Sequence, residues 1–171
     1  MGRTNATTAT VARGRIFAMM DADGDGVISA HDYLSRVDRA VQATGRSEDD
    51  PLVVAARGEA HKAWGAMDAN GDEKLTFEEY DAWVGADKFD NICRFALGSL
   101  FDLADADGDG ALDKAEFAVL RTALNNAPTN AAAAFDALDA DGDGRVDRDE
   151  YLASIRAYVI GDASPMGEAL Y

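Results

Sequence analysis

The sequence of 171 residues is poor in the features that mark several common protein classes. It holds a single cysteine, Cys93, so no disulfide can form within the chain, and a reducing cytoplasm fits this usage best. Only 3 prolines interrupt the chain, which together with abundant alanine favours an all-helical fold. No apolar run reaches membrane-spanning length, and the first twenty residues lack the apolar core of a signal peptide. We therefore expect a cytoplasmic protein.

Basic residues are also scarce, because 16 lysines and arginines stand against 32 acidic residues and leave a net charge of −16. Such a chain has nothing to neutralise phosphates, which excludes a nucleic-acid binder and disfavours an anionic membrane surface. Hydrophobic residues nevertheless make up 47% of the sequence, so it is not a disordered acidic tail. We expect a folded acidic protein, and a monomer.

The negative charge is concentrated in four twelve-residue segments. They hold twenty of the 32 acidic residues and four of the 16 basic ones, and the rest of the chain is neutral. Like charges crowded in this way repel one another, so we expect a cation to occupy each segment. The segments are DADGDGVISAHD (21–32), DANGDEKLTFEE (68–79), DADGDGALDKAE (105–116) and DADGDGRVDRDE (139–150).

The spacing within each segment identifies the cation. Aspartate or asparagine at positions 1, 3 and 5 supplies three oxygen ligands, and glycine at position 6 allows a sharp turn. Position 7 offers its backbone carbonyl, position 9 a ligand that can act through water, and position 12 a carboxylate able to bind with both oxygens. Six or seven hard oxygen ligands suit Ca²⁺ and do not suit a soft transition metal. We number the segments loops 1 to 4 in chain order.

Loops 3 and 4 carry the fullest ligand sets. Each supplies five carboxylates, a glycine at position 6 and a glutamate at position 12, so we predict a strong site in both. The predicted ligands, with the carbonyls of Ala111 and Arg145 at position 7, are Asp105, Asp107, Asp109, Ala111, Asp113 and Glu116 in loop 3, and Asp139, Asp141, Asp143, Arg145, Asp147 and Glu150 in loop 4.

Loop 1 differs from them at its last position. Asp32 at position 12 is one methylene shorter than glutamate, so two-oxygen coordination is harder and the six-fold coordination that Mg²⁺ also accepts is favoured. We predict an occupied site with weaker selectivity for Ca²⁺ over Mg²⁺. Its predicted ligands, with the carbonyl of Val27 and with Ser29 at position 9, are Asp21, Asp23, Asp25, Val27 and Asp32.

Loop 2 is predicted to be weak or empty. Glu73 occupies position 6, where the backbone needs a positive φ, and a non-glycine residue there costs about 1 kcal/mol or more. Its ligand set holds three carboxylates, the neutral Asn70 and Thr76, and a lysine at position 7. The candidate ligands, with the carbonyl of Lys74, are Asp68, Asn70, Asp72, Lys74 and Glu79.

Apolar residues recur at fixed places around the loops, as expected for helices that pack on one core. The short apolar residues at position 8 should pair across a two-stranded bridge, Ile28 with Leu75 and Leu112 with Val146. The recurring residues are Phe17, Trp64, Phe101 and Phe135 four residues before each loop, and Tyr33, Tyr80, Phe117 and Tyr151 just after position 12.

These motifs resemble those of the EF-hand superfamily, and within it the sarcoplasmic calcium-binding proteins and their bacterial relative calerythrin. The closer likeness rests on a chain longer than that of a calmodulin, on the 47-residue step between the starts of loops 1 and 2, and on Asp32 at position 12 of loop 1. The resemblance implies two EF-hand pairs packed together, residues 1–86 and 87–160, and a closing tail, residues 161–171. We expect helices at about 8–20, 30–43, 50–67, 77–86, 90–104, 114–125, 129–138 and 148–160, with a short hinge at 85–88.

Two functions fit this sequence. One is an intracellular Ca²⁺ buffer or carrier, and the other is a Ca²⁺ sensor that changes conformation and regulates a partner protein. Sensors expose a methionine-rich groove, whereas Met19, Met20 and Met67 are the only methionines in the expected helices, which favours the buffer. No Ser–His–Asp set, nucleotide loop or paired carboxylates occur outside the four loops, so we do not expect an enzyme.

Overall fold

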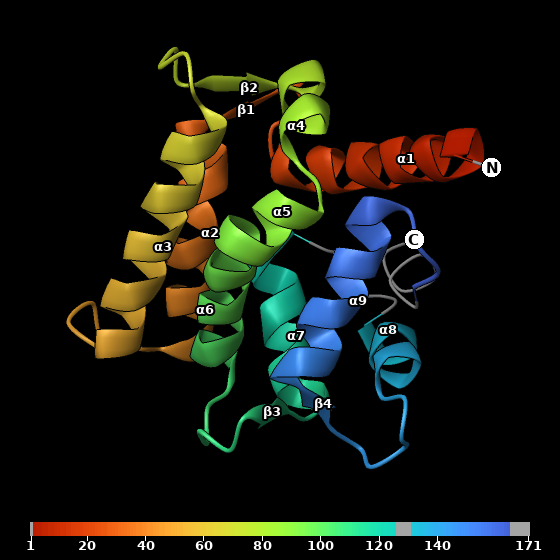
Figure 1. The fold of residues 1–171 in the computed structure, drawn as a ribbon. Coiled ribbons are helices and arrows are strands. Elements are labelled where there is room, and N and C mark those ends of the chain that lie inside the picture. The colour runs from red at the N-terminus through yellow and green to blue at the C-terminus, as the bar shows by residue number, and fades with distance from the viewer. Residues whose placement is uncertain (1, 126–130, 165–171) are drawn as a thin grey trace.

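The computed structural model describes residues 2–125 and 131–164, most of them in helices (Figure 1). The predicted all-α class with short β bridges is confirmed. No helix of these two stretches is both long and apolar enough to cross a membrane. The elements are α1 (Gly2–Met20), β1 (Val27–Ser29), α2 (Ala30–Thr44), α3 (Pro51–Met67), β2 (Lys74–Thr76), α4 (Phe77–Trp83), α5 (Ala86–Lys88), the π-helical turn η1 (Phe89–Cys93), α6 (Arg94–Ala104), β3 (Ala111–Leu112), α7 (Lys114–Ala123), α8 (Ala131–Leu138), β4 (Val146–Asp147) and α9 (Arg148–Ile160).

Capping residues explain where the helix after each loop begins. The residue at loop position 9 is the N-cap, and its side chain accepts a hydrogen bond from the backbone N–H of position 12. The carboxylate at position 12 accepts one in return from the backbone N–H of position 9, which completes a capping box. The four boxes are Ser29 with Asp32, Thr76 with Glu79, Asp113 with Glu116, and Asp147 with Glu150.

The β bridges join the loops two by two. Strands β1 and β2 pair antiparallel with Ile28 opposite Leu75, and β3 pairs with β4 with Leu112 opposite Val146, as predicted. All four side chains are fully buried. The two bridges lie at opposite ends of the molecule in Figure 1, so loops 1 and 2 form one end and loops 3 and 4 the other.

Aromatic rings connect the two helix–loop–helix units of each pair. Phe17 on α1 lies 6.1 Å from Tyr80 on α4 between ring centroids, and Tyr33 on α2 lies 5.9 Å from Trp64 on α3. The second pair repeats the arrangement, with Phe101 near Tyr151 and Phe117 near Phe135. The ring before one loop therefore packs against a ring after its partner loop, and all eight residues belong to one hydrophobic core.

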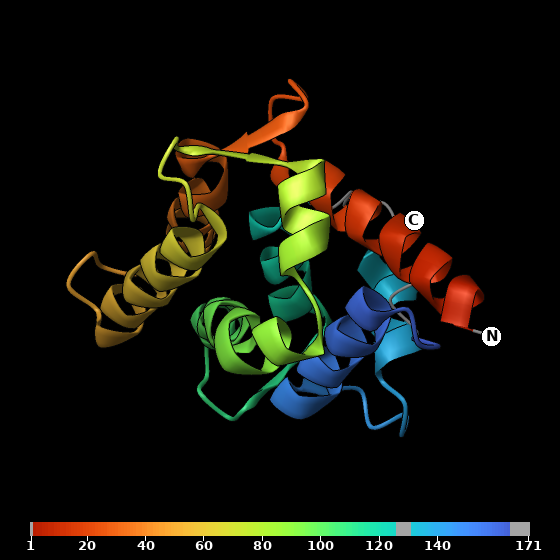
Figure 2. The ribbon, with the colours of Figure 1, turned by 45° about the horizontal axis from the view of Figure 1, so that its top comes forward.

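Three arginines from the first half of the chain hold the ends of helices in the second half. Arg13 donates to the carbonyl of Val159 in α9 at 3.0 Å, Arg39 to that of Ala123 in α7 at 2.9 Å, and Arg46 to that of Leu103 in α6 at 3.0 Å. Each acceptor lies in the last turn of its helix, where carbonyls lack a partner within the helix and cations are favoured. Helix α1 thereby lies beside α9, as both views show (Figure 2).

The connection between loops 2 and 3 differs from the prediction. Helix α4 ends at Trp83 and not near 86, Val84 and Gly85 are extended, and a helix resumes at Ala86 and continues through η1 to Ala104. The break is therefore two residues long, and the expected hinge at 85–88 is mostly helical. Periodicity could not locate this boundary, because Ala86–Lys88 has helix-forming side chains and no capping signal.

Other boundaries agree with the expectation. Helix α3 begins at Pro51 behind the N-cap Asp50, and α2 ends at Gly45, whose φ of 68° closes the helix in the left-handed region. Helix α1 is longer than predicted and extends back to Gly2. The start of the helix expected at 129–138 and most of the expected tail at 161–171 lie outside the described residues.

We predict that Leu75→Ala lowers the free energy of unfolding by about 2–5 kcal/mol, because it leaves a cavity under the first β bridge. Urea unfolding at a fixed Ca²⁺ concentration measures the change. Leu52→Ala, which removes the same atoms from an exposed position on α3, is the matched control and should change stability by less than about 1 kcal/mol. Equal losses in the two variants would contradict the central role of the bridge.

Candidate metal centres

All four loops share one backbone arrangement around the carboxylate of position 1. The backbone N–H of position 6 donates to that carboxylate, and the N–H of position 7 donates to the carboxylate of position 5 at 3.0 Å in loops 1 to 3 and 2.9 Å in loop 4. The backbone of each loop is therefore folded around its acids. The position 6 bonds are Gly26 to Asp21 (2.9 Å), Glu73 to Asp68 (3.0 Å), Gly110 to Asp105 (2.9 Å) and Gly144 to Asp139 (2.9 Å).

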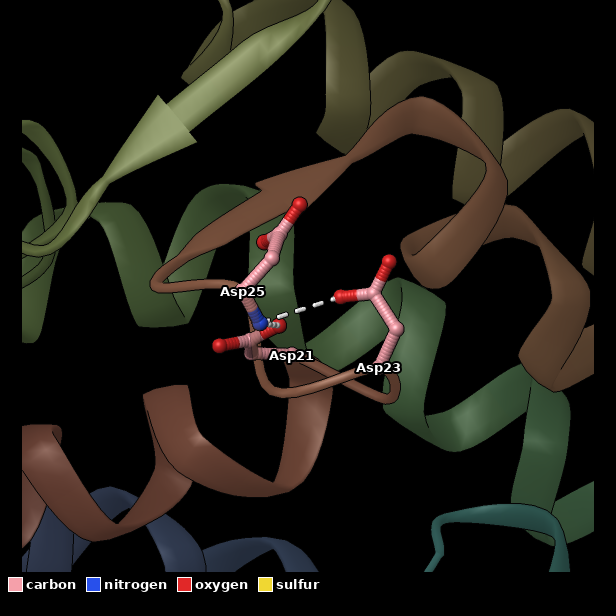
Figure 3. A group of neighbouring side chains, drawn as sticks. All are labelled: Asp21, Asp23 and Asp25. Carbon is pink, nitrogen blue, oxygen red and sulfur yellow. Dashed lines mark hydrogen bonds between the residues drawn. The ribbon is translucent and has the colours of Figure 1, made fainter.

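Loop 1 gathers three predicted ligands. The side chains of Asp21, Asp23 and Asp25 place carboxylate oxygens within 4.8 Å of one another (Figure 3). The backbone N–H of Asp25 donates to both Asp21 and Asp23 at 3.2 Å and holds two of the carboxylates in place. Asp32 is not part of this group. Its side chain is buried, and it accepts a hydrogen bond from the N–H of Ser29 at 3.0 Å.

Loop 3 brings its position 12 carboxylate into the cluster. Asp105, Asp107 and Glu116 have oxygens within 4.8 Å of one another. Glu116 accepts from the N–H of Ala106 at 3.0 Å through Oε1 and from that of Asp113 at 2.9 Å through Oε2, so it spans the loop.

A buried oxygen tests whether a cation fits loop 3. Asp105 is 7% exposed, and its Oδ1 atom has no hydrogen-bond partner among the described residues. A buried acceptor without a hydrogen-bond partner destabilises the fold, and the cost is higher for a charged carboxylate that also lies beside two others. A divalent cation at this point would satisfy Asp105 and neutralise its neighbours, so the donor set fits Ca²⁺.

Loop 4 gathers positions 1, 3 and 5, as loop 1 does. Asp139, Asp141 and Asp143 have oxygens within 4.8 Å of one another. Glu150 is not part of this group, and its carboxylate accepts from the N–H of Asp147 at 2.9 Å within the capping box. Asp147 is likewise engaged, since it accepts from the N–H of Glu150 at 2.7 Å.

The crowding of carboxylates alters their acidity in loop 4. The N–H of Arg145 favours the charged form of Asp143, but burial and the neighbouring acids outweigh it and raise the pKa of Asp143. The pKa of Glu150 is also raised. The N–H of Asp147 lowers it, but burial and three nearby carboxylates together raise it by more. A cation nearby would favour the charged form of both acids.

Loop 2 does not bring three acids together among the residues that the structure describes. The amide of Asn70 donates to Glu79 at 3.1 Å and to Asp72 at 3.4 Å, so a neutral donor already contacts both carboxylates. Glu73 has the predicted positive φ, 63°. A strained turn and a carboxamide in place of a third aspartate both act against cation binding.

An ion pair between loops was not predicted. The guanidinium of Arg145, at position 7 of loop 4, pairs with the carboxylate of Asp109 at position 5 of loop 3. Asp109 is not part of the loop 3 cluster and is paired with this cation instead. The sequence does place a basic residue, Arg145, in a loop that the β bridge joins to the acid-rich loop 3. The spacing of the residues could not show, however, that its side chain points across the bridge.

Comparisons with known proteins agree with this geometry. Two family models match, one described as an EF-hand domain pair over residues 94–156 and one as an EF hand over residues 15–35. A solved calcium-binding protein of Streptomyces coelicolor is 32% identical, with a TM-score of 0.73 over 89% of this chain and 99% of that one. The chain belongs to the EF-hand family of calcium-binding proteins.

Two further similar proteins match either a shorter segment or at lower identity. The probable calcium-binding protein CML16 of rice, Oryza sativa subsp. japonica, is 32% identical over 102 residues, which is 60% of this chain. The match covers 52% of the rice protein, so this EF-hand chain spans about half the length of that curated relative. The photoprotein clytin, with a TM-score of 0.76 over 96% of this chain and 93% of its own, is 17% identical and shows the fold alone.

We predict that Glu73→Gly restores binding in loop 2. Glycine at position 6 removes a strain of about 1 kcal/mol at a φ of 63°, and calorimetric titration should then detect one more Ca²⁺ than in the parent protein. Glu73→Gln is the matched control, because it removes the same charge but keeps the Cβ atom. If both variants gain the extra ion equally, charge and not backbone strain keeps loop 2 weak.

A second prediction concerns the ion pair between loops 3 and 4. Asp109 must leave Arg145 to reach a cation, so Arg145→Ala should raise the Ca²⁺ affinity of loop 3 by up to about fivefold. The amide NMR signal of Gly110, at position 6 of loop 3, follows that site during a titration. Arg148→Ala removes an equal charge that is paired with Asp102 instead, and it should change the affinity less. An equal increase in both variants would argue against a specific pair.

The raised pKa values of Asp143 and Glu150 predict proton release on Ca²⁺ binding. A proton held by either carboxylate must leave before the cation binds, so affinity should fall and proton release should grow from pH 7 to about pH 5. Titration calorimetry in buffers of different ionisation enthalpy measures the protons released. Unchanged affinity with no proton release at about pH 5 would be the opposite result.

Proposed function

We propose that this EF-hand protein is a Ca²⁺ buffer or carrier with strong sites in loops 1, 3 and 4 and a weak or empty loop 2. This proposal rests on the three carboxylate clusters, in each of which three ligand oxygens lie within 4.8 Å of one another. The proposed ligands are those predicted from the sequence, with the remaining position 12 acids, Asp32 and Glu150, moving into the sites when the cation binds. Mg²⁺ can compete, especially in loop 1, where the shorter Asp32 favours six-fold coordination.

The packing between the two loop pairs supports a buffer over a sensor. Met20 and Met67 are buried, Met19 is half-buried, and all three face the shared core. Helices α2 and α3 of the first pair pack against α7 and α6 of the second, so each pair already covers the apolar face of the other. A sensor needs such a face to become free for a partner helix.

One finding favours the sensor as a second candidate. The Streptomyces coelicolor protein, similar over nearly its whole length, is described as a calcium-binding protein in prokaryotic calcium-mediated regulation. If the same role applies here, Ca²⁺ would open the interface between the two pairs and expose apolar surface to a regulated partner.

Calorimetric titration of the metal-free protein tests the proposed sites. We expect three tightly bound Ca²⁺ ions. Glu116→Gln should remove one, because it weakens the position 12 ligand of loop 3, whereas Glu79→Gln at the same position of loop 2 should leave the number at three. Failure to bind Ca²⁺ at micromolar to millimolar concentrations, or loss of an ion in Glu79→Gln, would contradict the assignment.

Binding of an anilinonaphthalene sulfonate dye separates the two roles. The dye fluoresces on exposed apolar surface, so a buffer that becomes more compact should lose signal when Ca²⁺ is added. A sensor should gain signal because its apolar face opens. A gain that saturates at the stoichiometric Ca²⁺ concentration would replace the buffer by the sensor.

A further inference from the structure

A cavity of about 90 Å³ lies in the core between the two loop pairs, away from the acidic clusters. Its wall is almost entirely apolar and includes Met19, Met20 and Met67 from α1 and α3, and Leu97 and Ile155 from α6 and α9. Segments from both halves of the chain therefore enclose one space. An apolar space of this kind stays dry unless polar groups line it, and here a few do.

A buried positive charge faces this cavity. Arg36 on α2 is 6% exposed and lines the space; its guanidinium carbon lies 4.0 Å from the ring centroid of Tyr33, and its Nε atom donates to the Tyr33 carbonyl at 3.2 Å. The salt bridges found in the described parts of the chain join other cations to other acids, and none includes Arg36. A buried guanidinium without a carboxylate is costly, and an anion beside it would remove that cost.

Two buried hydroxyl groups also line the cavity. Tyr151 and Tyr158, both on α9, are 2% and 7% exposed, and neither hydroxyl has a hydrogen-bond partner among the described residues. Burial raises the pKa of Tyr151, so its hydroxyl keeps its proton and can donate. Arg36 and both tyrosines therefore line the same space.

We propose that the cavity is a binding site for a small organic anion, a carboxylate with a short apolar chain. The carboxylate would accept hydrogen bonds from Arg36 and from a tyrosine hydroxyl, and the chain would contact the methionines. The cavity is smaller than the space of about 150 Å³ that holds benzene, so the ligand has fewer than the roughly six non-hydrogen atoms of benzene. Propionate has this size and chemistry and is the probe of choice.

Methionine-methyl NMR of the full chain tests the site. Three of the five methionines line the cavity, so propionate should shift the methyl signals of Met19, Met20 and Met67 in a saturable titration. Propionamide, which has the same shape without the charge, should bind at least about tenfold more weakly. Running the titration both with Ca²⁺ and with a chelator makes a failure of the metal loops and a failure of the cavity separate results.

Substitutions locate the site. Arg36→Met keeps an unbranched side chain without the charge and should weaken propionate binding at least about tenfold, whereas Arg94→Met, at an exposed position on α6, should not. Tyr151→Phe and Tyr158→Phe remove single hydroxyls with little effect on packing, and at least one should weaken propionate binding while the melting temperature stays high. These two variants keep the test valid if Arg36→Met does not fold.

The outcomes are clear in either direction. Saturable shifts that depend on Arg36 and on a tyrosine hydroxyl establish the site. Absence of shifts in the parent protein up to high millimolar propionate in both metal states, or equal affinity for propionate and propionamide, would overturn the proposal.

Discussion

Repulsion among carboxylates held in short loops is the constraint on which the rest of this structure depends. Twenty of the 32 acidic residues lie in the four loops, and in three loops the oxygens of three acids stand within 4.8 Å of one another. Backbone N–H groups hold each acid in place, which lowers but does not remove the cost of the crowding. The loops are thus folded toward a state that only a cation completes, as the partnerless oxygen of Asp105 illustrates.

The loops are joined to the core by residues that serve two purposes. The carboxylate at position 12 caps the following helix and is also the last proposed ligand, so a cation that draws it inward acts directly on the start of that helix. The next residue in each case lines the central cavity: Tyr33, Tyr80, Phe117 and Tyr151. The last proposed ligand of each loop is therefore the chain neighbour of a residue that lines the cavity between the two pairs. The arginine contacts to helix ends also join the two pairs.

Local patterns predicted much of this fold. The position 8 residues Ile28 and Leu75 pair as expected because their burial and spacing leave one register. The positive φ of Glu73 was predictable because position 6 of such a loop requires it. The break at Val84–Gly85 was misplaced, since neither residue carries a capping signal that distinguishes it from its neighbours. Spacing alone could therefore name the loops but not every helix end.

Contacts between distant segments could not be predicted from the sequence. Arg145 was chosen for its carbonyl, yet its side chain pairs with Asp109 of the neighbouring loop, a contact that depends on side-chain direction across the bridge. The burial of Arg36 could not be predicted either, because arginine is most often exposed and the cavity that Arg36 lines is formed by helices from both halves of the chain. Both features depend on tertiary packing and not on local periodicity.

The most direct measurement is calcium anomalous diffraction from crystals of this protein grown with Ca²⁺. The account predicts a peak in each of loops 1, 3 and 4, with carboxylate oxygens at about 2.3–2.6 Å, and none or a weak one in loop 2. Loops that remain free of cations in such crystals, with their carboxylates still crowded together, would contradict it.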